Sequence, residues 1–241
     1  MKISLLHPSR SRPQQALETM VHWLQNIEYP QTWEYILSVD SNDPKIDEYH
    51  ALGMKGLQNV CMIVNDNQNL VQAANKAAAK VSISDILILI SDDFKCFKGW
   101  NKSIVSALEG KSGVLKTFDG VQRYIVTLPI LTKDYYDQQG YIYYPKYTHM
   151  FCDLDQTHKS DLQKKLIIRN DIVFSHNHYS KGGHPKDAVN IKADKTWNQG
   201  ERVYLQRCRE RFGLGNVNVY NLSPEARRAG HINWMKKKGV R

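Results

Sequence analysis

The chain has 241 residues, a length that suits one domain or one and a half domains around a hydrophobic core. Its hydrophobic fraction of 41% and charged fraction of 24% are ordinary for a globular protein and exclude collagen-like, low-complexity and broadly disordered classes. A formal net charge of +9 favours anionic partners, namely nucleotides, nucleic acid or acidic lipids.

The first half of the chain alternates the patterns of strands and helices. Apolar runs of strand length occupy residues 2–6, 35–39, 60–64 and 86–90. Segments 14–27 and 70–81 lie between them and carry apolar residues at helical spacing. The last run, Ile86 to Ile90, is continuous in Ile and Leu, as in a strand covered on both faces. This alternation predicts a mainly parallel sheet with crossover helices.

After Trp100 the pattern is less regular. We expect a helix over 102–108, a short strand over 172–174 and a long charged helix over 194–212. Two further apolar segments, 113–118 and 123–128, predict a hairpin that turns at Asp119-Gly120. Four tyrosines follow, and they suit either stacking on a sugar or base or a hydrophobic lid: Tyr141, Tyr143, Tyr144 and Tyr147.

Polar clusters follow three of the predicted strands. They are His7–Arg12 after the first strand, Asp40–Asp43 after the second and Ser91–Asp93 after the fourth. Ligands of open parallel sheets bind at the carboxyl ends of the strands. Because each of the three clusters follows the carboxyl end of a predicted strand, we expect them to converge on one crevice.

Two adjacent carboxylates, Asp92 and Asp93, end the fourth strand. They repel each other unless a cation or hydrogen-bond donors compensate the charge. A divalent metal held by carboxylate and diphosphate oxygens meets this need. The structural alternative is a helix N-cap, because a helical pattern begins just beyond, at Lys98. The preceding strand and the other two clusters favour the metal.

Two common phosphate-binding motifs are missing from the sequence. No G-x-G-x-x-G follows the first strand, and no G-x-x-x-x-G-K-[ST] occurs anywhere. Dinucleotide-dependent redox chemistry and P-loop phosphoryl transfer therefore lose their usual signature. A bound diphosphate would have to be neutralised by a metal and basic side chains.

Six segments, in this order, carry a family resemblance. They are ISLLHPSRSRP, YILSVDSNDP, NDNQNLVQAANKAA, ILILISDDFKCFKGW, YTHMFCDLDQ and DIVFSHNHYSKGGHPKD. The chain resembles glycosyltransferases of the GT-A type, close to the inverting family called family 2 and particularly to its short bacterial and phage-type members. The resemblance covers about residues 1–215. It implies a Rossmann-like α/β fold with a central, mostly parallel mixed sheet flanked by helices.

The resemblance assigns four residues to the nucleotide-sugar. Asp40 matches the aspartate that holds the base or ribose, and Ser9 and Arg12 lie where the first loop contacts the nucleotide. Asp92 matches the acid near the ribose and diphosphate. The donor that it implies is a nucleotide-sugar, with a UDP-sugar favoured on family grounds.

The resemblance also implies a divalent metal cofactor, Mn²⁺ or Mg²⁺. Asp93 matches the metal ligand, and His176 or His178 matches a late histidine that binds the metal or the diphosphate. Ile90 and Ser91 depart from the pattern, because many relatives have a third acid there. A surface or structural role is the alternative for either histidine.

Inverting transfer needs a base that deprotonates the acceptor hydroxyl. Asp153 is the first candidate and Asp155 the second, both in the segment that resembles the acceptor side. The two share a face if this segment is extended and diverge if it is helical. The alternative is a pair of solvated loop acids.

Three regions follow from this resemblance. Residues 1–110 would bind the sugar nucleotide, residues 111–215 would bind the acceptor in the same domain, and residues 216–241 would form a basic extension. The last nineteen residues hold six Lys or Arg and one acid, which suits contact with a phosphate backbone or simple solvation.

The acceptor stays open between two classes at this point. The basic charge and the tyrosines favour a modified base in phage DNA, while a cell-envelope or lipopolysaccharide glycan is the alternative. Outside glycosyl transfer, a nucleotidyltransferase would show a glycine-rich first loop. A non-catalytic nucleic-acid-binding protein would leave the strand-end acids without a purpose.

Location and redox state follow from simple features. The N-terminal apolar run, Ile3 to Leu6, is too short for a signal-peptide core or a membrane span, so we expect a cytoplasmic protein without a transmembrane segment. Four widely spaced cysteines argue against a zinc knuckle or a disulfide framework.

Overall fold

The computed structural model describes residues 1–28, 32–54, 56–81, 84–179, 182 and 185–229. Its strands are β1 (Lys2–Ser9), β2 (Thr32–Asp40), β3 (Val60–Asn65), β4 (Ile86–Leu89), β5 (Phe94–Lys95), β6 (Val114–Phe118), β7 (Ile130–Thr132), β8 (Leu166–Val173) and β9 (Ser175–His176). Its helices are α1 (Pro13–Gln25), α2 (Ile46–His50), α3 (Leu70–Ala79), α4 (Trp100–Leu108), α5 (Lys133–Gln139), α6 (Cys152–Leu162), α7 (Ala188–Asp194), α8 (Trp197–Arg209) and α9 (Pro224–Arg228), with a 3-10 turn η2 (Arg211–Gly213).

Within these residues, seven strands form one mixed sheet in the order β3-β2-β1-β4-β7-β6-β8. The first four run parallel, as the sequence predicts. β7 is antiparallel to both β4 and β6, and β8 is again parallel to β6. A separate two-stranded ladder joins β5 to β9. The predicted fold class, a mostly parallel central sheet flanked by helices, is confirmed.

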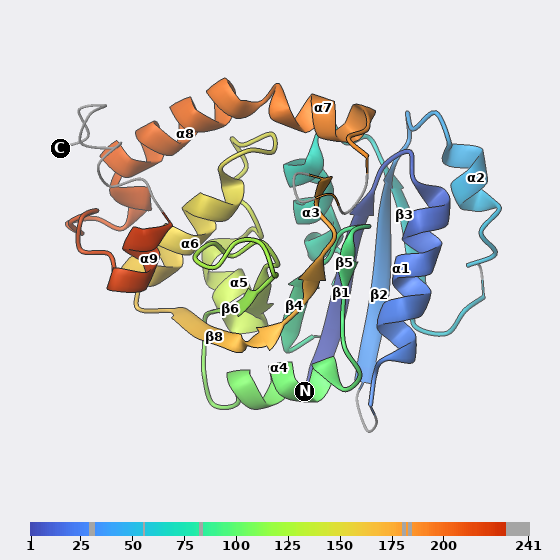
Figure 1. Ribbon diagram of the computed structural model, residues 1–241, viewed down its shortest axis with the longest axis horizontal. Helices are drawn as coiled ribbons and strands as arrows, with labels where there is room; N and C mark the ends of the chain where they lie inside the picture. Colours follow the sequence, from blue (N-terminus) through green and yellow to red (C-terminus); the bar gives the residue numbers. More distant parts are fainter. Residues whose placement is uncertain (29–31, 55, 82–83, 180–181, 183–184, 230–241) are drawn as a thin grey trace.

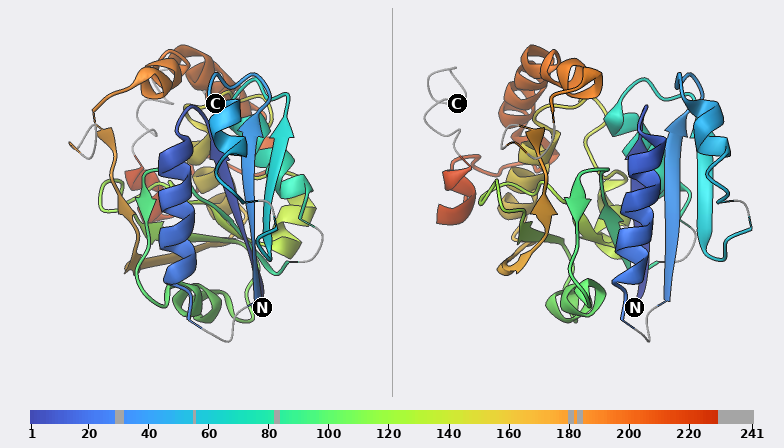
Figure 2. Two further views of the ribbon diagram at one scale, coloured as in Figure 1. Left: turned by 90° about the vertical axis from the view of Figure 1, so that its right-hand side faces the viewer. Right: turned by 45° about the vertical axis from the view of Figure 1, so that its right-hand side comes forward.

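Each face of the sheet buries its own apolar core (Figures 1 and 2). On one face, α1 and α4 pack through Trp23 and Trp100, whose rings meet edge to face at 5.0 Å. On the other face, the small alanine side chains of α3 pack against β1 and β2, and α5, α6 and α8 extend this layer. Coverage on both faces explains why β4 is a continuous apolar run.

Three local predictions are wrong. Residues 123–128 form no strand, because Val126 N–H donates to the Thr157 hydroxyl and Thr127 donates to Asp119. The antiparallel partner of β6 is instead β7, so the hairpin across Asp119-Gly120 is absent from this described segment. β1 also continues through Pro8 to Ser9. A proline is tolerated there because β1 pairs with β4 only as far as Leu6.

The long helix predicted over 194–212 is divided. α7 ends at Asp194 and α8 starts at Trp197. α8 then passes close to the segment before α6 at Gly200, where an added Cβ would lie 2.2 Å from the Met150 carbonyl oxygen. The two helices run along the edge of the molecule where β1 and β2 end (Figure 1).

Two of the three predicted regions, 1–110 and 111–215, both contribute strands to the large sheet. β6, β7 and β8 join the sheet begun by β1–β4, and the boundary at 110 stays a prediction. Of the predicted basic extension, α9 packs against α6, while residues 230–241 lie outside the described residues. Within the described part of the chain, no helix combines the length and the apolar character needed to cross a bilayer.

Candidate functional site

Parallel pairing brings the polar ends of β1, β2 and β4 to one edge of the sheet. Asp92, just after β4, lies between two side chains of β1. Ser9 donates its hydroxyl to both carboxylate oxygens at 2.9 and 3.1 Å, and His7 Nε2 lies 2.9 Å from Oδ1. Tyr49 from α2 contacts the Ser9 hydroxyl at 2.7 Å. Asp92 is therefore held firmly in place.

Two arginines of the first loop reach acids of other strands and helices. Arg12 donates to Asp187, the N-cap residue of α7, at 2.6 and 2.9 Å, and its guanidinium lies 3.8 Å from Asp92. Arg10 pairs with Asp40, which also accepts from an amide of Asn67 at 2.9 Å. The predicted nucleotide residues Ser9, Arg12 and Asp92 thus meet directly, and Asp40 ends the neighbouring strand.

A second group of acids surrounds His176. Its Nε2 lies 3.2 Å from Asp93, and its Nδ1 lies 3.1 Å from Asp119. The Ser91 hydroxyl donates to the other oxygen of Asp93 at 2.5 Å. Asp119 is 1% exposed and accepts from the Val121 N–H at 2.7 Å and from two further donors of its own loop. The imidazole is therefore clamped between two oriented carboxylates.

The β5–β9 ladder explains how a late histidine reaches the aspartate pair. Phe94 pairs with His176, and their rings stack at 4.1 Å. The backbone N–H of His176 donates to the Asp119 carbonyl at 3.0 Å, and that of Asn177 donates to the Asp93 carbonyl at 2.9 Å. Backbone bonds on both sides therefore fix the imidazole against Asp93.

The charges of His176, Asp93 and Asp119 stabilise one another. Burial works against the charged form of His176, but its hydrogen bonds and ion pairs with Asp119 and Asp93 outweigh burial and raise its pKa to about 9. Burial likewise opposes ionisation of both acids, yet the hydrogen bonds from His176 hold the pKa of Asp93 and of Asp119 below the ordinary value. The group therefore holds two carboxylates around one cation.

Two more histidines lie near this group. The His178 ring lies 5.0 Å from that of His176. His149, from the loop before α6, is within electrostatic range of Asp93 and His178. Burial lowers the pKa of His149 to about 4, which makes its imidazole neutral at pH 7. A neutral imidazole is the form that binds metals.

Asp153 and Asp155 diverge because their segment is helical. Asp153, in the first turn of α6, is partly buried, and burial raises its pKa, with the charge of Asp119 adding to the effect. Asp155 is 2% exposed and accepts from Arg207 Nε at 2.9 Å and from the Tyr147 hydroxyl at 3.1 Å. Of the two, Asp153 is within electrostatic range of Asp119, while Asp155 lies in a buried ion pair with Arg207.

A metal fits part of this geometry. Within the described ranges, no three His, Cys, Asp or Glu side chains are arranged to hold a metal ion by themselves. Asp93 and His176 supply a carboxylate and an imidazole that face each other across 3.2 Å. A carboxylate suits Mn²⁺ and Mg²⁺, and an imidazole favours a transition metal. The pair fits Mn²⁺ if the metal replaces the proton that His176 Nε2 shares with Asp93, and if diphosphate and water fill its other positions.

Sequence reasoning missed several residues of this region. Asp119 was expected in a hairpin turn, Asp187 and His149 were not singled out, and nothing pointed to Arg207 as the partner of Asp155. An Asp-Gly pair after a buried strand was the available signal for Asp119. The other contacts join segments far apart in the chain, and the sequence pattern carries no signal for them.

Comparison with known proteins shows the fold. No family model and no curated protein matches the chain. Among solved structures, it resembles the mannosyltransferase PcManGT from Pyrobaculum calidifontis in complex with GDP-Man and Mn²⁺, with a TM-score of 0.68, 11% identity, and 94% of this chain and 73% of that chain covered.

TarS from S. aureus (residues 1–349) is also similar. Its TM-score is 0.58 at 14% identity over 90% of this chain and 75% of that chain. The complex of TarS 1–349 with UDP has a TM-score of 0.56 at 12% identity, with 93% of this chain and 76% of that chain covered. These neighbours have the GT-A fold, and the chain described here shares it.

Proposed function

We propose that the chain is a metal-dependent glycosyltransferase that moves a sugar from a nucleotide-sugar, a UDP-sugar by preference, to an acceptor hydroxyl with inversion. The observation that carries the proposal is the Asp93–His176 pair at the strand-end edge of a GT-A sheet. Ligands of open α/β sheets bind at that edge. The GDP-Man and UDP complexes of the structural neighbours agree with a nucleotide-sugar donor.

The nucleotide would lie across the ends of β1, β2 and β4. Asp40 and Asp92 offer carboxylates to base or ribose donors, and Ser9 holds Asp92 in position. Arg12 offers a planar guanidinium that suits diphosphate oxygens, since such pairs are commonly bidentate. Its guanidinium lies 3.8 Å from Asp92 and donates to Asp187, so a diphosphate would take the place of Asp187 as its partner.

Asp93 and His176 would hold Mn²⁺ or Mg²⁺, with His178 beside them. When bound, the ion supplies positive charge to the leaving diphosphate. Asp119 would fix the orientation of the imidazole, because the second nitrogen of a metal-bound histidine almost always donates to a carboxylate, carbonyl or water.

Asp153 would accept the proton of the attacking hydroxyl. Its raised pKa suits a group that takes up a proton and then holds it. Asp155 remains the second candidate, but its carboxylate is committed to Arg207 and Tyr147. We therefore assign the base to Asp153 and a structural role to Asp155.

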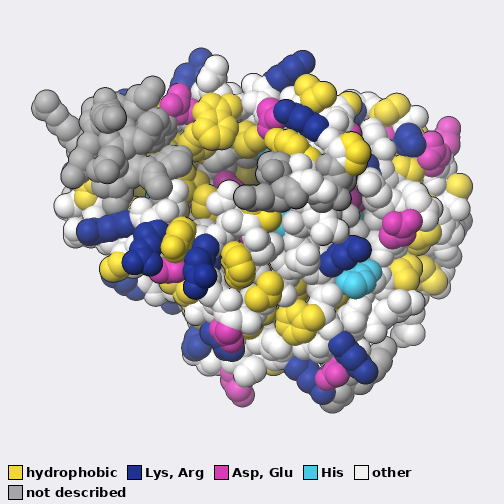
Figure 3. All heavy atoms as spheres, in the orientation of Figure 1, with side chains coloured by type: hydrophobic (Ala, Val, Ile, Leu, Met, Phe, Trp, Pro, Cys, Tyr) yellow, Lys and Arg dark blue, Asp and Glu magenta, His cyan; other side chains and the backbone are white. Residues whose placement is uncertain are grey.

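For the acceptor we propose a modified base in DNA. The net charge of +9 supports a polyanionic acceptor, and Lys and Arg side chains gather over α9 and the adjoining part of β8 (Figure 3). α9 contributes Arg227 and Arg228 to this region. An anionic cell-envelope glycan has similar charge and is the alternative that the acceptor assay must separate.

The first test is thermal unfolding against a panel of nucleotide-sugars, with and without Mn²⁺. A ligand that binds only the native state raises the unfolding temperature. We expect a rise with one donor that is lost when the metal is removed. No rise with any donor, together with a rise with DNA, would favour a non-catalytic nucleic-acid-binding protein instead.

The second test uses Asp93→Ala, with Asp137→Ala as an exposed acid control on α5. Asp93→Ala is expected to abolish metal-dependent turnover and leave the fold intact, and the control is expected to keep turnover. Wild-type turnover in Asp93→Ala contradicts the site assignment. Transfer to modified DNA, or to an envelope glycan in its place, identifies the acceptor class.

A further inference from the structure

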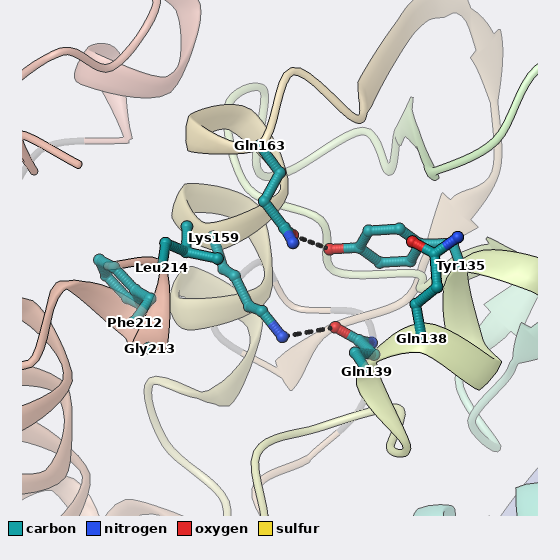
Figure 4. Close-up of a pocket in the computed structure, with 8 residues that line it drawn as sticks. All are labelled: Tyr135, Gln138, Gln139, Lys159, Gln163, Phe212, Gly213 and Leu214. Carbon is teal, nitrogen blue, oxygen red and sulfur yellow. Dashed lines mark hydrogen bonds between the residues drawn. The ribbon is translucent and has the colours of Figure 1, made fainter. Parts of the chain in front are cut away.

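A cavity of about 260 Å³ lies between α5, α6 and η2 (Figure 4). Its polar wall consists of Tyr135, Gln138, Gln139, Lys159 and Gln163. None of the residues proposed above for donor, metal or base lines it. Lys159 lies six residues along α6 from Asp153, about 9 Å at 1.5 Å per residue. The cavity is therefore separate from the proposed transfer site.

Lys159 has only neutral hydrogen-bond partners among the described residues. Its Nζ donates to Gln139 Oε1 at 3.1 Å and to the Tyr141 hydroxyl at 2.7 Å, although the residue is only 6% exposed. The ammonium also lies 4.6 Å from the centre of the Tyr141 ring. A buried ammonium is normally paired with a carboxylate, because burying an unpaired charge is costly.

The nearest buried acid is already paired. Asp155 accepts from Arg207 Nε at 2.9 Å, and Arg207 also lies 3.9 Å from the ring of Tyr144. The buried group of Asp155, Lys159 and Arg207 thus carries two positive charges and one negative charge. Burial and the charge of Arg207 lower the pKa of Lys159 to about 8, and the opposite charge of Asp155 offsets this only in part.

The surrounding amides add donors without acceptors. Gln163 Oε1 accepts from the Tyr135 hydroxyl at 2.7 Å, which orients its amide nitrogen as a further donor at the cavity. Behind Gln139, the amide nitrogen of Gln156 is buried and makes no close hydrogen bond among the described residues, although it interacts with the Tyr135 hydroxyl. Lys159 and the Gln163 amide therefore bring a positive charge and a further donor to the cavity.

We infer that this cavity is a binding site for a small oxyanion, a carboxylate or phosphate group, held by Lys159 and the amide N–H groups around it. Such a group supplies the missing negative charge and accepts several hydrogen bonds at once. The cavity is larger than one such group, so it also admits part of the molecule that carries it. The site is independent of the proposed glycosyl transfer.

The test measures thermal unfolding of the full chain in sodium phosphate and in sodium acetate, each against sodium chloride at equal ionic strength. At ten times the Kd, a ligand raises the folding equilibrium constant about elevenfold, or roughly 3–6 °C in unfolding temperature for a chain of this size. We expect this rise in wild type and in the control Lys80→Met, which changes an exposed lysine just after α3. A rise with phosphate alone or acetate alone identifies the group.

Two variants remove the site in different ways. Lys159→Met removes the charge and keeps the length of the side chain. Gln163→Glu places a carboxylate one helical turn from Lys159 and keeps the acceptor for Tyr135. Both are expected to lose the rise, and Gln163→Glu is expected to unfold no lower than wild type without added anion.

If Lys159→Met does not fold, Gln163→Glu alone decides the question. No rise with either anion in wild type overturns the inference. An equal rise in Gln163→Glu also overturns it, because the introduced carboxylate should exclude a second anion.

Discussion

Replacing Asp155 with Asn tests whether its ion pair with Arg207 supports the fold. Both side chains are less than a tenth exposed, and the carboxylate also accepts from the Tyr147 hydroxyl at 3.1 Å. Asn keeps the size and one acceptor oxygen but removes the charge. The variant leaves Arg207 on α8 and Lys159 on α6 buried, without the negative charge of Asp155.

The expected loss follows from this imbalance. Removing one partner of a buried ion pair costs about 3–5 kcal/mol of unfolding free energy, because the remaining charge is uncompensated. A chain of this size loses roughly 2–4 °C in unfolding temperature per kcal/mol. Asp155→Asn should therefore unfold roughly 6–20 °C below wild type.

Urea and thermal unfolding followed by circular dichroism measure this loss. The matched control is Asp137→Asn, which breaks an exposed pair with Lys133 at 2.7 Å and should change stability by less than about 1 kcal/mol. The double variant Asp155→Leu/Arg207→Met should recover much of the loss, because it removes both charges. If Asp155→Asn is as stable as Asp137→Asn but lacks turnover, the structural assignment is wrong and Asp155 acts in the chemistry.

Three further predictions concern the site and its support. Asp153→Asn should lower turnover by about 10²-fold or more without changing the unfolding temperature. In wild type, kcat/KM should rise with pH through a pKa above the ordinary aspartate value, because burial disfavours the ionised base. The same pH dependence in Asp153→Asn as in wild type would contradict this role. Asp119→Asn should weaken Mn²⁺ binding about 10–100-fold in a calorimetric titration, because it loosens His176; unchanged affinity removes Asp119 from the site. Gly200→Ala should lower the free energy of unfolding by about 1–3 kcal/mol in urea, because the added Cβ would clash with the Met150 carbonyl oxygen. An unchanged urea midpoint would mean that α8 shifts to accommodate the methyl group without loss of stability.

The first four strands could be predicted because each is a local pattern. The strand Ile86–Leu89 is buried on both faces, and its continuous run of apolar residues predicts such burial. The convergence of the polar clusters could also be predicted, because parallel strands bring their carboxyl ends to the same edge of the sheet. Ser9 and Asp92, 83 positions apart, meet as that argument predicts.

The remaining features depend on contacts that leave no local pattern. β7 has three residues and β5 and β9 have two each, which is too short for any periodicity to be seen. The run 123–128 has the apolar pattern of a strand, but the Val126 backbone N–H donates to the Thr157 side chain of α6, and the Thr127 hydroxyl donates to Asp119 of the preceding loop. Whether Asp153 and Asp155 share a face depended on whether their segment is extended or helical. Residues 152–162 form a helix, so the two side chains point in different directions.

The β5–β9 ladder has a consequence for the order in which the molecule folds. It joins Asp93 to His176 across 83 positions through only two residue pairs. Closing so long a loop has a large entropic cost, which two pairs of residues cannot offset alone. The ladder should therefore form only after β6, β7 and β8 have joined the sheet and shortened the path between its ends. Recovery of the Asp93–His176 contact during refolding should then trail the recovery of helix and sheet signals.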